Sequence, residues 1–77
     1  MVLGYIYTDE LDKAIREYCY ENSLTIKRFS KQCKINYNTY YVAKKRGTIG
    51  MSTVYRLRKV LKDFDFNSLP RRGDGMN

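Results

Sequence analysis

Apolar residues recur along this chain at the spacing of amphipathic helices, and the longest such stretch comes first. Over about 9–21, five of them follow at positions i, i+3, i+4, i+7 and i+8: Leu11, Ala14, Ile15, Tyr18 and Cys19. Thr8 precedes this stretch and can cap its first turn, whereas Asn22 tolerates left-handed backbone and can end it. The pattern predicts a helix over about 9–21.

Two shorter helices are predicted next, separated by a brief break in the pattern. The second helix covers about 25–33 with Thr25 as its cap, and its apolar positions are Ile26, Phe29 and Cys33. The third covers about 37–46, begins after Asn36 and ends at Gly47, and its inward positions are Tyr40 and Ala43. The chain therefore has two short helices on either side of a turn of three or four residues.

A fourth helix is predicted over about 53–64, where Ser52 supplies the cap. Its apolar stripe lies opposite a basic face and consists of Val54, Leu57, Val60, Leu61 and Phe64. Thr48–Met51, between the third and fourth helices, is expected to be a loop. Residues 1–7 are apolar and aromatic but too few for a helix, so they form either an arm or a short strand.

The last part of the chain has few apolar residues. Phe66 and Leu69 are expected to fold back onto the core, and Pro70 stops any further element. These elements predict an all-α fold, a compact bundle of four to five short helices over 1–69, followed by a flexible tail over 70–77. The 77 residues allow one domain, whose core should form where five residues converge: Leu11, Ile15, Phe29, Leu57 and Leu61.

Composition excludes several classes of function. The chain has no histidine, so serine–histidine and cysteine–histidine catalysis are excluded. Cys19 and Cys33 fall on apolar helix faces and are expected to be core residues rather than a disulfide framework or a metal site. No acid/base pair or glycine-rich phosphate loop is present, so we expect no enzyme, no cofactor and no small-molecule ligand. No apolar run approaches the ~20 residues of a membrane span, and residues 1–7 do not form a signal peptide, so a cytoplasmic protein is expected.

Charge is distributed unevenly along the chain. Residues 1–24 carry a net charge of −3 and residues 63–77 a net charge of −1, whereas residues 25–62 carry eleven Lys and Arg and no acid. A solvated helix face normally mixes both signs, because opposite charges at i,i+4 stabilise a helix and like charges repel. A polyanionic partner compensates for this repulsion, so the acid-free block 25–62 favours binding to nucleic acid.

The run Ile26–Lys45, IKRFSKQCKINYNTYYVAKK, resembles the helix-turn-helix domains of the phage Cro and lambda-repressor family. In that family a large apolar residue precedes a small one in the first helix of the motif, here Phe29 and Ser30, because the second helix crosses closely there. The other apolar positions of the motif correspond to Cys33, Ile35, Tyr40 and Ala43. Two positions depart from the family. Lys34 stands where the turn usually has a left-handed glycine, at a cost of ~1 kcal/mol, and Tyr40 is larger than the usual Ile or Val.

The resemblance implies how the motif, about 25–46, contacts DNA. The recognition helix lies in the major groove in that family, which carries base contacts over to Asn36, Tyr37, Asn38, Tyr41 and Val42. Asn38 is the best candidate, because one amide can bond an adenine at two positions. In that family the start of the motif's first helix and the loop after the recognition helix contact phosphates. The resemblance therefore implies that the residues in contact with the DNA backbone are Thr25, Lys27, Lys44, Lys45, Arg46 and Thr48.

Other interpretations of these residues stay open at the level of sequence. Asn36 can be a helix cap only, and Tyr37 and Tyr41 can be partly buried against the preceding helix. The basic side of the fourth helix can contact DNA or be plain solvent surface, and it consists of Arg56, Arg58, Lys59 and Lys62.

On this resemblance we expect a small Cro-like transcriptional regulator that binds double-stranded DNA sequence-specifically, a repressor of a phage or mobile element that is nucleoid-associated when bound. A weak homodimer or a dimer formed on DNA is expected, and the spare apolar surfaces are Tyr5, Ile6 and Tyr7 and the stretch Phe64–Leu69.

Two alternatives stay open. One is an RNA-binding or nonspecific nucleic-acid protein, for which eight tyrosines offer stacking surfaces. The other is a protein-binding inhibitor or adaptor built on the same fold.

Overall fold

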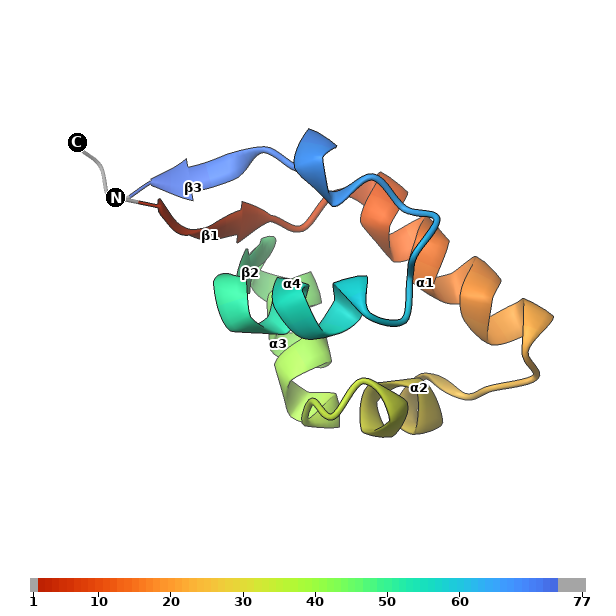
Figure 1. Ribbon diagram of the computed structural model, residues 1–77. Coiled ribbons are helices and arrows are strands. Elements are labelled where there is room, and N and C mark those ends of the chain that lie inside the picture. The colour runs from red at the N-terminus through yellow and green to blue at the C-terminus, as the bar shows by residue number, and fades with distance from the viewer. Residues whose placement is uncertain (1, 74–77) are drawn as a thin grey trace.

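The computed structural model describes residues 2–73, and this part of the chain is mostly helical with a small sheet (Figure 1). In chain order the elements are β1 (Val2–Ile6), α1 (Asp9–Glu21), α2 (Ile26–Gln32), α3 (Tyr37–Arg46), β2 (Thr48–Gly50), α4 (Met51–Arg58), the 3-10 helix η1 (Phe66–Ser68) and β3 (Arg71–Gly73). In Figure 1, β1 and β3 lie at one end of the molecule and α2 at the other. The four helices agree with the expected bundle, whereas the sheet is an addition that an all-α fold does not contain.

The first three helices begin and end close to where the sequence predicts. At the start of α1, the hydroxyl of Thr8 accepts a hydrogen bond from the backbone N–H of Leu11 at 3.1 Å. Asn22 is the C-cap at the other end of this helix. Left-handed backbone follows one residue later than expected, at Ser23 with φ 54°. Asn22 instead donates its side-chain amide to the carbonyl of Tyr18 at 2.9 Å, which satisfies one of the last free carbonyls of α1.

The sequence prediction of the fourth helix is wrong at both ends. It covers Met51–Arg58 rather than 53–64, and its N-cap is Gly50, so Ser52 lies inside the first turn instead of capping it. Leu61 still reaches the core, because its N–H bonds the carbonyl of Leu57 at 2.8 Å before the chain turns away. Ending the helix early lets the following segment reverse direction and return Phe66 to the core, 6% exposed.

The sheet joins three segments that are distant in the sequence. Its strand order is β2-β1-β3, and both pairings are antiparallel. Thr48–Met51 is therefore not a loop as expected, since Thr48–Gly50 pairs with Gly4, Tyr5 and Ile6 of β1. Residues 71–73 of the expected flexible tail form β3, whereas residues 74–77 of that tail lie outside the described residues.

Glycine is required where β1 and β2 approach most closely. A Cβ atom on Gly4 would collide with the carbonyl oxygen of Ile49, and Gly4 faces Gly50 in the register. The pairing of β1 on both of its edges also uses Tyr5 and Ile6 within the chain. Phe66 and Leu69 are likewise buried, as expected for residues that fold back onto the core. The two stretches expected to offer spare surface for a dimer therefore contribute largely to the fold of the chain itself.

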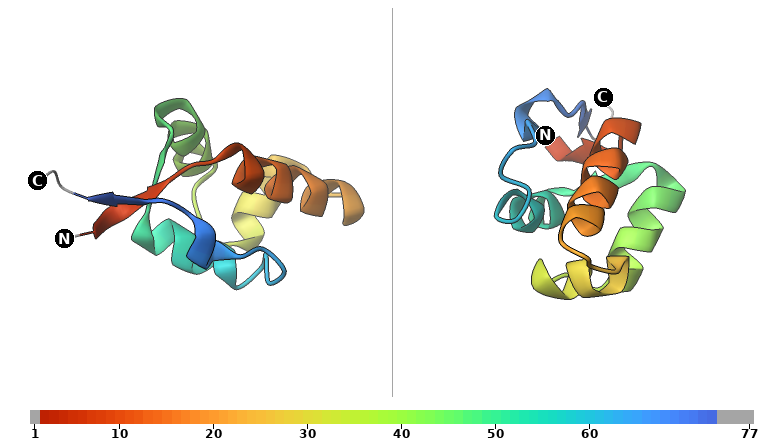
Figure 2. Two further views of the ribbon diagram at one scale, coloured as in Figure 1. Left: turned by 90° about the horizontal axis from the view of Figure 1, so that it is seen from above. Right: turned by 90° about the vertical axis from the view of Figure 1, so that its right-hand side faces the viewer.

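The core lies between α1 and the other helices. In the right-hand view of Figure 2, α1 crosses the molecule with α3 on one side, α4 on the other and α2 at one end. All five residues expected to converge there are buried, at 5% exposure or less: Leu11, Ile15, Phe29, Leu57 and Leu61. Cys19 and Cys33 are buried free thiols, as expected, and burial raises the pKa of Cys33 to about 11.

Phe29 is the central side chain of this core and should dominate its stability. It is fully buried, and its ring packs edge-on to that of Tyr18 with 5.6 Å between centroids. Phe29→Ala should lower the free energy of unfolding by about 3–5 kcal/mol, because it leaves a cavity in a small core. Urea denaturation followed by circular dichroism measures this loss. Tyr20→Ala, at a side chain 87% exposed, is the matched control and should change little. Equal effects of the two substitutions would contradict the central role of Phe29.

The turn between α2 and α3 holds Lys34 in left-handed backbone, with φ 60°. Side chains with a Cβ are strained in this conformation, so Lys34→Gly should raise the free energy of unfolding by up to about 1 kcal/mol relative to Lys34→Ala. The comparison with alanine separates backbone strain from loss of the charge. Chemical denaturation of the two variants measures the difference. A Lys34→Gly variant no more stable than Lys34→Ala would show that the turn is unstrained.

Candidate functional site

The outer side of α3 carries side chains suited to contacting a partner. Tyr40 and Ala43 face inward, with 7% and 5% of their surfaces exposed. Because successive residues of an α-helix are about 100° apart, the opposite side faces solvent, and its residues are Asn38, Tyr41, Val42 and Lys45. Tyr41 and Val42 are 56% and 38% exposed, which leaves the ring of Tyr41 and the methyl groups of Val42 available for contact.

Three shallow hollows surround α3, and each contains residues that the sequence assigns to DNA contacts. The first lies between α3, β2 and the start of α4, and its lining includes Asn38, Val42, Arg46 and Thr48. The second lies between α3, α1 and the start of α2, and its lining includes Tyr37, Tyr41, Lys44 and Lys45. The third lies between α2 and the start of α3, and its lining includes Thr25, Lys27, Asn36 and again Tyr37. All the residues assigned from the sequence therefore gather around one helix.

Two of these residues have structural roles as helix caps. The side chain of Asn36 accepts the backbone N–H of Asn38 at 2.8 Å, and the hydroxyl of Thr25 accepts that of Arg28 at 3.1 Å. The cap interpretation of Asn36 is thus confirmed. By contrast, the side-chain amide of Asn38 is exposed at the start of α3, and it makes no hydrogen bond to any other group within residues 2–73. Asn38 is free to bond a partner, whereas Asn36 already bonds the backbone.

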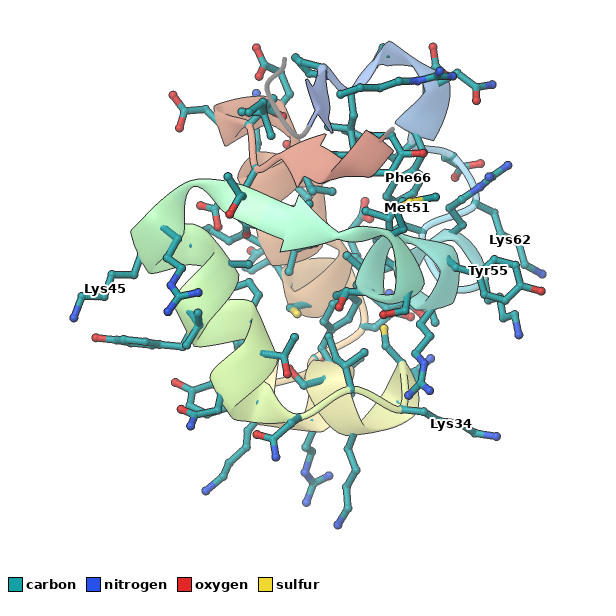
Figure 3. All side chains as sticks on the ribbon, turned by 90° about the vertical axis from the view of Figure 1, so that its left-hand side faces the viewer. Lys34, Lys45, Met51, Tyr55, Lys62 and Phe66 are labelled. Atoms are coloured by element: carbon teal, nitrogen blue, oxygen red, sulfur yellow. The ribbon has the colours of Figure 1, made fainter. Side chains whose placement is uncertain are left out.

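The acid-free block forms a basic surface that extends beyond the residues assigned by resemblance. Arg28 and Lys31 are exposed on α2 and line the same hollow as Lys27. The resemblance to the family does not assign these two residues to DNA contacts, although their place in the acid-free block is a signal for them. In Figure 3, Lys45 projects from one side of the molecule and Lys34 from the other, so cations lie at both ends of the surface that α2 and α3 form.

Basic residues of α4 and of the segment directly after it make contacts within the chain. The guanidinium of Arg56 donates to the backbone carbonyl of Lys34, and the ammonium of Lys59 lies 4.6 Å from the ring centre of Tyr55. Tyr55 and Lys62 project on the side away from Lys45 in Figure 3. Arg56 therefore supports the turn between α2 and α3.

A polar cluster behind α3 joins three elements through one carboxylate. Oδ1 of Asp12 accepts the hydroxyl of Tyr7 at 2.7 Å and that of Tyr40 at 3.2 Å. The other oxygen, Oδ2, lies 3.0 Å from Nε of Arg16, and Nζ of Lys44 lies 3.8 Å from Oδ1. We call these five residues the Asp12 cluster. The i,i+4 spacing of Asp12 and Arg16 is a local signal for their pairing, but no local signal connects either residue to Tyr7 or Tyr40.

The Asp12 cluster has consequences for titration and for Lys44. Burial and the hydrogen bond to Asp12 raise the pKa of the Tyr7 hydroxyl, and burial is the main cause that raises the pKa of Tyr40. Both hydroxyls thus stay protonated and act as donors near neutral pH. Lys44, assigned to a phosphate contact, has a carboxylate partner within the chain. Lys45 and Arg46, its neighbours, are exposed.

Within residues 2–73, no three His, Cys, Asp or Glu side chains come together as a metal ion would require. None of the helices described there has the length and apolar character needed to cross a membrane.

Comparisons of this chain with models of protein families, with curated proteins and with solved structures find no match. The resemblance to Cro and lambda-repressor domains therefore rests on the residues of the motif alone.

Proposed function

We propose that this chain binds double-stranded DNA sequence-specifically and that α2, the turn and α3 act as a helix-turn-helix. One observation carries the proposal: the exposed side of α3 presents Asn38, Tyr41 and Val42 in the centre of a surface drawn from the acid-free block. An α-helix with its side chains is about 10–12 Å across, and the major groove of B-DNA is about 12 Å wide. The exposed side of α3 therefore has the size and chemistry to read base edges.

The roles of the side chains follow from their contacts. Asn38 is proposed to read a base through its amide, and Tyr41 and Val42 to contact thymine methyl groups or neighbouring sugars. Lys27, Lys45, Arg46 and Thr48 are proposed to contact phosphates on either side of α3, and Arg28 and Lys31 join this set. Asn36 and Thr25 orient the two helices as caps. Lys44 is not needed for the phosphate contacts, because Asp12 already pairs with it.

The biological role proposed is that of a small Cro-like transcriptional regulator, a repressor of a phage or mobile element. The resemblance of Ile26–Lys45 to the helix-turn-helix motif of that family supports this role. One recognition helix reads only a few base pairs, so two protomers on a near-palindromic site are also proposed. Pairing on DNA through a surface other than β1 fits the fold, since β1 is already paired on both edges.

Duplex binding should depend strongly on salt. If each domain neutralises roughly five phosphates, log affinity against log salt should have a slope of about −4 to −5 per domain, because bound cations release counterions from DNA. Fluorescence anisotropy with a labelled duplex at several salt concentrations measures the slope, and single-stranded RNA of equal length is the comparison. A slope near zero would exclude binding through the basic surface. Tighter binding to the RNA would favour the RNA-binding alternative.

Substitutions on the outer side of α3 should separate base reading from phosphate binding. Asn38→Ala should cost about 1–3 kcal/mol on the best duplex and little on unrelated duplexes, because it removes base hydrogen bonds only. Lys45→Ala should weaken binding to all duplexes similarly and reduce the salt slope by about one. Selection from a random duplex library supplies the best site, and anisotropy supplies the affinities. If the two variants behave alike, the division of roles is wrong.

A further inference from the structure

The attachment of α3 to the rest of the molecule includes an unusual polar contact. Asp12 lies on α1, Tyr7 follows β1, and Tyr40 is one of the two inward residues of α3. The two tyrosine rings pack edge to face, 6.2 Å apart, with both hydroxyls directed to the same carboxylate oxygen. The Asp12 cluster thus connects the strand, the first helix and the helix proposed to enter DNA.

α3 buries two side chains, Tyr40 and Ala43. Ala43 contributes only a methyl group, so Tyr40 is the larger of the two buried contacts that can fix the rotation of α3 about its own axis. The side chain of Asp12 is 17% exposed, and hydrogen bonds to a partly buried charge are stronger than those between neutral groups. The Tyr40 hydroxyl therefore supplies a directional contact at the middle of α3.

We infer that Asp12 is a positioning residue that sets the orientation of α3 through Tyr40 and keeps Lys44 and Arg16 away from DNA. This inference rests on the proposed function. Side chains extend about 5–6 Å from a helix axis, so a rotation of α3 by about 10° moves them by roughly 1 Å. A paired amide–adenine contact does not tolerate such a shift, because its hydrogen bonds must stay within about 2.7–3.2 Å. Orientation of α3 thus affects reading by Asn38 more than it affects phosphate contacts.

The cluster also controls the charge available to a polyanion. Asp12 lies within 4 Å of one cation on its own helix and one on α3, at 3.0 Å for Arg16 and 3.8 Å for Lys44. Replacing the carboxylate with an amide frees both cations while leaving an oxygen that can still accept the tyrosine hydroxyls. Asp12→Asn therefore tests the charge, and Tyr40→Phe, which keeps the ring, tests the orientation.

Two variants and two matched controls test the inference on duplex DNA. Tyr40→Phe should lower the ratio of affinities for the selected and unrelated duplexes by about three- to tenfold, with the salt slope unchanged. Asp12→Asn should tighten binding to unrelated duplexes and steepen the salt slope by about one to two. Tyr20→Phe removes a hydroxyl from an 87% exposed side chain, and Glu17→Gln removes a charge whose partner is Lys13. Tyr20→Phe should not change the ratio, and Glu17→Gln should not steepen the slope in this way.

Hydrogen exchange in the free protein separates this inference from the proposed function. In Tyr40→Phe, the amides of α3 and of its C-cap Gly47, whose N–H bonds the carbonyl of Ala43 at 2.8 Å, should exchange several-fold faster relative to those of α1. A wild-type chain that selects no duplex, combined with this faster exchange, would overturn the proposed function but keep the positioning role. Variants that match their controls in exchange, ratio and slope would overturn the positioning role, whatever the wild type binds.

Discussion

The position of α3 depends on two inward side chains, Tyr40 and Ala43, and the proposed base contacts depend on that position. A helix that exposes most of its residues can bury little apolar surface, so its packing free energy is small. The chain compensates by fixing α3 at both ends and at its middle. Asn36 caps the start, Gly47 ends the helix in left-handed backbone with φ 75°, and the Tyr40 hydroxyl bonds Asp12. The same few residues that hold α3 leave its outer side free.

The helices could largely be predicted from the sequence because their signals are local. The caps Thr8, Thr25 and Asn36 each precede a helix that begins at the next residue, as the side-chain hydrogen bonds explain. The apolar periodicity also predicted the core, since residues three and four apart share one face of a helix. In the candidate site, the inward position of Tyr40 and the exposure of its neighbours followed from the same periodicity.

A short strand within residues 1–7 is one of the two expectations, and β1 confirms it. The partners of β1 and the end of α4 could not be predicted, because they depend on contacts between distant residues. The strands β2 and β3 have three residues each, too few to show an alternating pattern, and both are held by pairing with β1. The stripe in the region of α4 continues beyond Arg58, but the chain buries Leu61 and Phe66 by turning instead of by extending the helix. For the same reason, the pairing of Lys44 with Asp12 could not be predicted, because the two residues lie on different helices.

The N-terminal strand links the fold to the site more directly than its distance from α3 in the sequence suggests. The N–H of Tyr7 bonds the carbonyl of Gly47 at 2.9 Å, where α3 ends, and Ile6 pairs with Thr48. The hydroxyl of Tyr7 also donates to Asp12, the carboxylate that accepts the hydroxyl of Tyr40 at the middle of α3. Tyr7, the residue directly after β1, therefore contacts the end of α3 and is linked to its middle through Asp12. Like charges along the acid-free block repel one another in the free protein, and the contacts of β1 and Asp12 oppose that repulsion. Loss of β1 and Tyr7 would therefore remove contacts that hold both the end and the middle of α3.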